Sequence, residues 1–492
     1  MTTADVAIVG AGFSGIGMAI ALKKTGCDDF VVLERAATLG GTWRDNDYPG
    51  CACDVPSMLY SFSFEPYAGW TRRYPPQAEV EAYLVRCAEK YGLTSHLRLR
   101  TELLEAAYDE AGAIWRLQTT QGEVRARVLI AGLGPLNRAR VPDVPGLAAF
   151  AGASFHSSAW DHAVDLKGKR VAVVGTGASA IQIVPAIAPD VERLYVHQRT
   201  PAWIIPKNDR AVPGARKALR RLRPLAWTER QAIYWGLEAR GIGFVRRQEL
   251  LAIGRAEAKR HLERQVADPA LRARLSPNYQ IGCKRVLLSD DFYPALQRPN
   301  VELVSSQVAR LGEHSVVAAD GSEREVDAVV WATGFQAADG IAPVRIYGRG
   351  GVELGDAWRD GMEAYLGISV AGFPNLFMLV GPNTGLGHNS MIVMIEAQIR
   401  YVASALDYMR RNRVTALDVR PDVQRSFNGR LQERMARTVW SSGCGSWYLD
   451  KRGKNTTIWP GFTFTYRRLT RRIDPSRYAI VGIGSPALAS SS

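Results

Sequence analysis

Short uninterrupted hydrophobic runs, each followed by a glycine-rich turn and a helical stretch, dominate the pattern of this chain. The first run spans residues 5–9 and leads through such a turn into hydrophobic positions spaced as in a helix. A second run, residues 171–174, is followed by the same sequence of features. An uninterrupted hydrophobic run is typical of a parallel strand buried on both faces, so each copy predicts a strand–turn–helix unit.

The first turn, residues 10–15, reads Gly-Ala-Gly-Phe-Ser-Gly, which is the spacing of a dinucleotide-binding turn. Gly10 permits the tight turn, Gly12 lets a pyrophosphate approach the backbone, and Gly15 lets the helix lie close to the strand. The next run ends in Glu34, whose carboxylate would accept hydrogen bonds from ribose hydroxyls and repel a 2′-phosphate. We therefore expect FAD or NAD here. The residues expected at this first cofactor are Gly10, Gly12, Phe13, Ser14, Gly15, Glu34, Gly41, Thr42, Trp43, Asp54 and Tyr60.

The second turn reads Gly-Thr-Gly-Ala-Ser-Ala from Gly175, with Ala180 at the third glycine position. The step along the chain that leads from Gly10 to Glu34 leads from Gly175 to Arg199, so the sign of the charge is reversed. A guanidinium binds phosphate through two parallel hydrogen bonds. We therefore interpret Arg199 as a contact to the 2′-phosphate of NADPH, with a surface arginine that binds no ligand as the alternative. The residues expected at this second cofactor are Thr176, Gly177, Ala178, Ser179, Gln182, Arg199 and Thr200.

Three later segments complete the predicted architecture. Residues 326–334 predict the last strand of the NADPH domain, and residues 375–380 predict a strand that returns to the FAD domain. A helix starting near Ser390 would direct its positive end toward a reduced flavin, which makes Asn389 a candidate contact, with a plain connecting loop as the alternative. Residues 212–277 have a helical pattern and predict an inserted lid.

The predicted fold is therefore α/β, with two Rossmann-like dinucleotide-binding domains and an inserted helical subdomain. A length of 492 residues agrees with three such parts. We assign residues 1–147 and 341–492 to a discontinuous FAD domain, 148–211 and 278–340 to the NADPH domain, and 212–277 to the helical insert.

Composition restricts partners and compartment. The formal charge is +14, with arginines concentrated in residues 210–274, but no nucleic-acid-binding signature accompanies them. We expect a solvated helical face and no nucleic-acid partner. No apolar run is long enough to span a bilayer, and the first strand begins too early for a signal peptide, which favours the cytoplasm.

The six cysteines are scattered, and the closest two, Cys51 and Cys53, have one residue between them. We expect free thiols and no disulfide. A disulfide reductase needs a redox pair near the flavin, usually separated by two residues, so the spacing argues against that class. No metal cofactor is expected.

Residues 150–161 read Phe-Ala-Gly-Ala-Ser-Phe-His-Ser-Ser-Ala-Trp-Asp. This segment resembles the fingerprint of the Baeyer-Villiger monooxygenases, with every fixed position matched. The signature residues are Phe150, Gly152, His156 and Trp160. Related enzymes that oxygenate nitrogen or sulfur usually carry another aromatic residue at the Trp160 position. The resemblance implies an NADPH- and O₂-dependent flavoprotein that converts a ketone to an ester or lactone through a C4a-peroxyflavin, with N- or S-oxygenation of an amine or sulfide as the alternative.

The same resemblance implies roles for four further residues. Arg285 is the expected catalytic arginine and Asp54 the carboxylate that positions it. Lys284 is a second expected contact to the NADPH 2′-phosphate, and Trp447 lies in a segment that contacts NADP and the substrate pocket in the family. The small-molecule partners are then a ketone and O₂, and the expected assembly is a monomer or weak homodimer.

Overall fold

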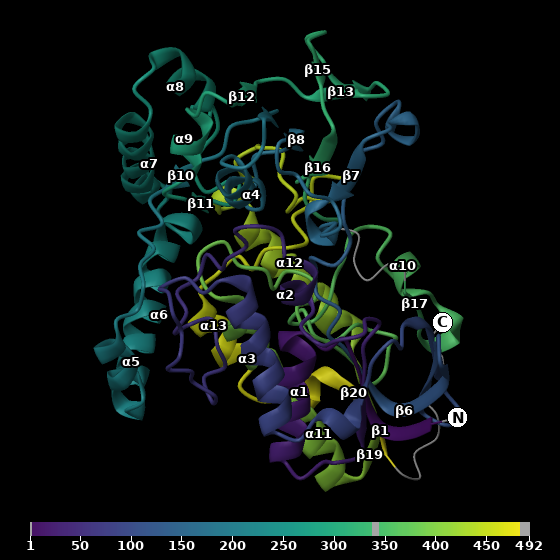
Figure 1. Ribbon diagram of the computed structural model, residues 1–492. Helices are drawn as coiled ribbons and strands as arrows, with labels where there is room; N and C mark the ends of the chain where they lie inside the picture. The colour runs from purple at the N-terminus through teal and green to yellow at the C-terminus, as the bar shows by residue number, and fades with distance from the viewer. Residues whose placement is uncertain (1, 337–343, 483–492) are drawn as a thin grey trace.

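The computed structural model describes residues 2–336 and 344–482. Figure 1 shows two sheets with their helices and a helical arm along one side. The fold is α/β with two Rossmann-like dinucleotide-binding units and an inserted helical subdomain, as the sequence predicts. The predicted boundary between residues 340 and 341 lies outside the described residues.

The larger sheet joins the beginning of the chain to its last third. Its strand order is β17-β4-β5-β6-β1-β2-β3, and β18 also pairs with β6. The central strand, β1 (Thr2–Val9), lies parallel to both of its neighbours. The other strands are β2 (Phe30–Leu33), β3 (Leu97–Arg98), β4 (Leu103–Asp109), β5 (Ile114–Thr119), β6 (Gly122–Ala131), β17 (Arg345–Tyr347) and β18 (Leu376–Met378).

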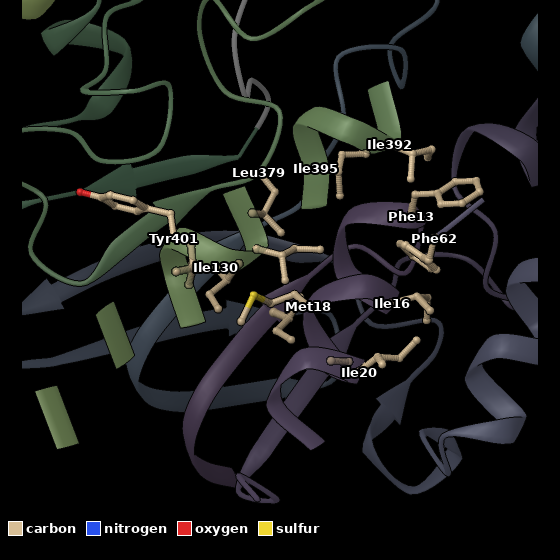
Figure 2. Packing of buried hydrophobic residues seen from close by; sticks show 14 of the residues in the cluster. Phe13, Ile16, Met18, Ile20, Phe62, Ile130, Leu379, Ile392, Ile395 and Tyr401 are labelled. Carbon is tan, nitrogen blue, oxygen red and sulfur yellow. The ribbon is translucent and has the colours of Figure 1, made fainter. Parts of the chain in front are cut away.

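Two long helices, α1 (Phe13–Lys24) and α11 (Met391–Asn412), pack together against this sheet. Figure 2 shows side chains of α1 meeting those of α11 and of the sheet; it labels Phe13, Ile16, Met18, Ile20, Ile130, Leu379, Ile392, Ile395 and Tyr401 among them. Full burial of an aliphatic or aromatic side chain contributes about 1.5–3 kcal/mol. This packing therefore fixes the start of each helix, which is where the candidate cofactor residues lie.

The smaller sheet is entirely parallel, with strand order β12-β9-β8-β16-β7. Its strands are β7 (Ala153–His156), β8 (Arg170–Val174), β9 (Arg193–His197), β12 (Val301–Val304) and β16 (Ala328–Trp331). A separate three-stranded sheet consists of β13 (Val308–Leu311), β14 (Ser315–Ala318) and β15 (Glu323–Glu325). The helices of this unit are α4 (Ala180–Ile187) and α9 (Phe292–Leu296). Hydrophobic residues of β8, β9 and β16 pack on those of α4, as expected for strands buried on both faces.

The insert is helical, as its pattern predicts, and lies along one side of the molecule in Figure 1. It comprises α5 (Gly214–Arg220), α6 (Arg223–Val245), α7 (Leu251–Gln265) and α8 (Pro269–Leu275). The chain leaves through β10 (Ile204–Ile205) and returns through β11 (Leu287–Leu288), and these two short strands pair with each other. The remaining elements are α2 (Thr42–Asp45), α3 (Gln77–Lys90), α10 (Leu354–Ala357), β19 (Val414–Val419), α12 (Pro421–Met435), α13 (Thr463–Leu469) and β20 (Tyr478–Gly482).

One sequence-based expectation is wrong. Cys283 and Cys444 form a disulfide, with 6.3 Å between their Cα atoms and 161 positions between them in sequence. The two segments meet only because the end of the insert folds against the loop after α12, a proximity that cysteine spacing does not encode. The other four cysteines are free thiols, as expected. Within residues 2–336 and 344–482, no helix is long and apolar enough to cross a bilayer.

Candidate active site

Both glycine turns open on one cavity of about 900 Å³. The turn after β1 lies on one side and the turn after β8 on the other, because parallel strands place their carboxyl ends at the edge where ligands bind. Every candidate cofactor residue lines this cavity except Gly15. The two candidate catalytic residues, Asp54 and Arg285, line it as well.

Packing explains why the first turn needs its glycines. Gly10 has φ +97°, and a Cβ there would lie 2.6 Å from the carbonyl oxygen of Gly132. A Cβ at Gly15 would collide with the carbonyl oxygen of Gly10. Gly15 therefore holds α1 against the strand and does not face the cofactor.

The glycine turn after β1 and the start of α1, called the first cradle below, fit a pyrophosphate. Among the described residues no side chain caps the first turn of α1, although Phe13 and Ser14 line the cavity. An uncapped helix start with free backbone N–H groups is a favourable site for a phosphate. A Cβ at Gly12 would make only ordinary contact with the Gly41 Cα, at 3.6 Å, so this position is open toward the cavity.

Glu34 directly follows β2 and is buried at the cavity wall. One carboxylate oxygen accepts the backbone N–H of Ala11 at 2.8 Å, and the other accepts a hydrogen bond from Arg44 Nη1 at 2.9 Å. The acid is thus fixed beside the glycine turn by a partner that sequence reasoning missed. Arg44 directly follows Trp43, and its place at the end of a glycine-rich segment was the available signal.

The glycine turn after β8 and the residues around it, called the second cradle below, contain cations where the first cradle contains an acid. A Cβ at Gly177 would have no atom within 4 Å, so a ligand can approach the backbone there. Arg199 follows β9 and is exposed, and Lys284 reaches the same part of the cavity. Burial lowers the pKa of Lys284, and the neighbouring Arg199 lowers it further. Two adjacent cations repel each other, and a phosphate dianion between them would remove that cost.

Gln182 and Thr200 have partners within the protein. Gln182 accepts a hydrogen bond from the Tyr48 hydroxyl at 3.0 Å and donates one to the Ala52 carbonyl at 2.9 Å. It therefore links α4 to the loop that carries Asp54. The backbone carbonyl of Thr200 accepts a hydrogen bond from the Thr176 hydroxyl at 3.2 Å.

Arg285 and Asp54 form an ion pair inside the cavity. Arg285 donates from Nε at 2.9 Å and from Nη2 at 2.5 Å, both to Asp54 Oδ2. Each side chain keeps about a third of its surface exposed, at 33% and 30%. Asp54 is the main cause of a raised pKa at Arg285, so the guanidinium stays charged throughout the working pH range.

Tyr448 is a neighbour of this pair that sequence reasoning missed. It is buried, its hydroxyl has no hydrogen-bond partner among the described residues, and burial raises its pKa to about 12. The adjacent Trp447 is 41% exposed and packs on it at 4.5 Å between ring centroids. The disulfide of Cys444 anchors the same loop to the residue that precedes Lys284.

Asn389, the candidate flavin contact, is buried just before α11. Its Nδ2 donates to Glu238 Oε1 of α6 at 2.6 Å, and Ser390 caps α11 by accepting the Ile392 N–H. Trp43 and Tyr60 also line the cavity, and Trp43 Nε1 donates to the Tyr60 hydroxyl at 3.0 Å. Glu238 was not anticipated, because nothing in its helical context distinguishes it from a surface acid.

The signature segment lies outside the cavity lining. His156 Nδ1 lies 2.8 Å from the Ser158 hydroxyl, and His156 Nε2 lies 3.0 Å from the Gly334 carbonyl. Trp160 packs edge-on against Phe155. A Cβ at Gly152 would lie 2.5 Å from the Asp327 carbonyl oxygen, whereas Phe150 belongs to the hydrophobic core beside β16. These contacts fix β7 beside β16, whose end lines the cavity.

The cysteines nearest the cavity are poor candidates for a redox pair. Burial raises the pKa of Cys51 to about 12 and that of Cys53 well above its usual value. Both are free thiols. A thiol that stays protonated is a weak nucleophile, so the structure does not support disulfide chemistry at this position.

An acidic cradle, a cationic cradle and a charged arginine on one cavity define a two-dinucleotide flavoprotein oxidoreductase. A family model described as "Pyridine nucleotide-disulphide oxidoreductase" matches residues 7–212. A Baeyer-Villiger monooxygenase of Streptomyces coelicolor is 50% identical over 482 residues, covering 97% of this chain and 92% of the relative.

Two solved structures extend the similarity to three dimensions. One is an oxidized steroid monooxygenase bound to NADP, with TM-score 0.87 and 30% identity, covering 98% of this chain and 100% of the other. Another is an OTEMO complex with FAD and NADP, with TM-score 0.85 and 28% identity, covering 95% and 97%. The chain belongs to the Baeyer-Villiger monooxygenase family. This membership supports oxygen insertion beside a carbonyl over N- or S-oxygenation.

Proposed function

We propose that the protein oxidises a ketone to an ester or lactone with NADPH and O₂, and that Arg285 carries the oxygenation step. The observation behind the proposal is the charged Arg285–Asp54 pair on the cavity that both cradles share. FAD bound in the first cradle would supply the redox chemistry, namely acceptance of hydride from NADPH and activation of dioxygen. The protein must then stabilise negative charge on oxygen close to a carbonyl carbon.

Arg285 is suited to that task because one of its donors is uncommitted. Nε and Nη2 both bind Asp54, whereas Nη1 has no hydrogen-bond partner among the described residues. A fixed cation in a site that excludes water stabilises an oxyanion far better than a cation in bulk solvent does. Arg285 would thus favour the deprotonated oxygen nucleophile and then stabilise the negative charge that forms on the ketone oxygen.

Asp54 positions Arg285 and does not itself react. Two hydrogen bonds to a single carboxylate oxygen hold the guanidinium plane, so the uncommitted Nη1 keeps one orientation. Lys284 and Arg199 would bind the 2′-phosphate of NADPH, and Glu34 would bind the ribose of FAD. Trp447, which lines the cavity, would help to exclude water from it. The insert, which the sequence predicts as a lid, places none of residues 212–277 in the lining.

The assembly and compartment are inferred from the sequence. We infer a monomer or weak homodimer in the cytoplasm, and we assign the FAD, NADPH and insert regions to the residue ranges given above. His156 and the rest of the signature act by fixing β7 against β16, since none of the four residues lines the cavity.

The experiment that tests the proposed function is a screen of ketones with product identification. Each ketone is incubated with purified protein, FAD and NADPH, and products are separated by mass. We expect ketone-stimulated NADPH oxidation and a product one oxygen atom heavier that is an ester or lactone. Turnover of sulfides or amines only, with every ketone inert, would favour electrophilic N- or S-oxygenation instead.

A further inference from the structure

The inward side of helix α6 buries two charged side chains together with the core residues Ala226 and Tyr234. Arg230 is buried and donates from Nη1 to the carbonyls of Met58 at 2.8 Å and Ser61 at 2.9 Å. Glu238 is buried and accepts hydrogen bonds from Asn389 and from the Thr463 hydroxyl, each at 2.6 Å. A helix on the surface of a water-soluble domain normally buries apolar residues and exposes charges. Packing against the core therefore does not account for the apolar residues on the exposed side of α6.

One strip on the exposed side of α6 carries no charge, although the exposed Arg240 lies on the same helix. The positions of the strip recur at steps of three and four residues, as one side of a helix requires, and all are exposed. We call the following residues the outer face of α6: Leu225, Thr228, Ala232, Trp235, Ala239 and Ile242. Trp235 exposes 54% of its surface and Leu225 exposes 47%.

The apolar surface continues onto the neighbouring helix α13. The rings of Trp235 and Phe464 lie 6.0 Å apart, and Phe464 is itself 44% exposed. Leu219 and Leu222, before α6, are more than half exposed. Scattered apolar residues are ordinary on a protein surface, but a continuous aromatic and aliphatic patch marks an interaction site.

Cations border this patch. Arg221 and Arg223 flank Leu222, and Arg467 and Arg468 lie on α13 between Phe464 and Leu469. Within residues 2–336 and 344–482 none of these four arginines forms an ion pair within 4.0 Å. The nearby acid Glu229 is already bound to Arg216 and Arg220, at 2.8 and 2.7 Å. The border therefore keeps an uncompensated positive charge.

We propose that the outer face of α6 docks the enzyme on a membrane surface that contains anionic lipid. Tryptophan and leucine on an apolar strip with arginines at its edges are the composition of a helix lying in the bilayer interface. Anionic headgroups would neutralise the arginines while the strip enters the boundary of the acyl chains. A second copy of the chain fits less well, because a symmetric contact would bring two cationic borders together. Nucleic acid would leave the uncharged strip without a partner.

The test is co-sedimentation of the FAD-loaded enzyme with vesicles. One preparation contains phosphatidylcholine alone, and the other contains equal parts of phosphatidylcholine and phosphatidylglycerol. We expect binding to the second preparation, weakened by added salt, and much weaker binding to the first. Because one interfacial cation changes membrane partition about five-fold, Arg221→Gln with Arg223→Gln should lower binding by roughly 25-fold.

Matched variants separate this site from general surface effects. Trp235→Ser should lower vesicle binding strongly, whereas Leu104→Ser should not, because Leu104 is an exposed leucine on β4. Arg310→Gln, on β13, is the control for the two arginines. All variants should keep the parent's FAD content and ketone-stimulated NADPH oxidation in solution. These readouts confirm that the folds are intact.

Three results would overturn the proposal. The first is unchanged vesicle binding by Trp235→Ser and by the arginine variant. The second is absence of binding to anionic vesicles. The third is absence of vesicle binding together with a concentration-dependent dimer that Trp235→Ser abolishes, which would assign the patch to a second copy of the chain.

Discussion

Arg285 binds a single oxygen of Asp54 through two of its nitrogens, at 2.9 and 2.5 Å, although 231 positions separate the two residues in sequence. Asp54 lies in the first dinucleotide unit, after a turn at Pro49 and Gly50, whereas Arg285 follows the helical insert. The ion pair therefore forms only when the two dinucleotide units are assembled. If Arg285 carries the oxygenation step, as proposed above, that step requires correct packing between the two units.

Replacing Arg285 with alanine should separate reduction from oxygenation. NADPH should still bleach the flavin absorbance of Arg285→Ala under anaerobic conditions, since hydride transfer depends mainly on the alignment of the two cofactors. Ester formation should fall by about 10²–10³-fold or more, as for loss of an oxyanion-stabilising donor. Stopped-flow spectra and product analysis measure the two steps, and oxygen uptake should yield hydrogen peroxide.

Asp54→Ala should give a milder form of the same defect, because the guanidinium keeps its charge and loses its orientation. Arg310→Ala, a surface arginine on β13, serves as the control. Near-normal ester formation by Arg285→Ala on a ketone that the parent accepts would show that the mechanism is wrong.

The coenzyme preference should depend on Arg199. Removing a charge-assisted hydrogen bond costs about 1.5–3 kcal/mol, so Arg199→Ala should weaken NADPH binding by roughly ten- to hundred-fold. Binding of NADH, which lacks the 2′-phosphate, should stay nearly unchanged. Steady-state kinetics with both coenzymes measure the ratio. Arg193→Ala, at the opposite end of β9, is a matched control. Equal losses with both coenzymes would contradict the placement of the 2′-phosphate.

The two glycine turns should be separable by substitution. Gly12→Val would place a side chain in the path of the FAD pyrophosphate and should abolish flavin retention. Gly177→Val should leave flavin bound but prevent reduction by NADPH, because open space surrounds its Cβ position and the fold tolerates a side chain there. Flavin absorbance of the purified variants and anaerobic reduction distinguish the outcomes. Full flavin content in Gly12→Val would reject the first cradle.

Much of this architecture was predictable because local patterns encode it. The hydrophobic run that precedes Glu34, residues 30–33, coincides with β2. Ser390 caps α11 at the position where the sequence predicts a helix start. Contacts between distant segments were not predictable. The Cys283–Cys444 disulfide and the Glu238–Asn389 hydrogen bond each depend on how the insert folds back, and no spacing rule specifies that. Tyr448 was missed for the same reason.

The disulfide should stabilise the loop that carries Trp447. Closing a chain segment of this length restricts the unfolded state and contributes about 3–5 kcal/mol. Cys444→Ser should therefore lower the melting temperature, whereas Cys27→Ser, which removes a free and partly exposed thiol, should have little effect. Alkylation of the denatured, unreduced protein should modify four cysteines. Modification of all six in freshly purified protein would show that the bond does not form.

Acid stability should depend on His197. This side chain is buried at the end of β9, near Arg324 and the Ser306 backbone. Burial lowers its pKa to about 4, and Arg324 contributes to this lowering against the smaller opposing effects of the Ser306 backbone, Glu302 and Asp320. The unfolded chain keeps the ordinary value of 6.5. Between these values the unfolded state binds the extra proton, so His197 destabilises the folded protein as the pH falls from about 6.5 toward 4.

The cost of keeping His197 neutral should reach about 2 kcal/mol at pH 5 and nearly vanish at pH 7. His197→Asn does not titrate in this range. The free energy of unfolding of the variant, relative to the parent, should therefore rise by about 2 kcal/mol between pH 7 and pH 5. Other titrating groups, such as Asp418, whose pKa burial raises to about 6, contribute equally to the variant and the parent. Their contributions therefore cancel in this difference. Urea unfolding without coenzyme at the two pH values measures it. A pH-independent difference would mean that His197 is protonated in the folded protein as readily as in the unfolded chain.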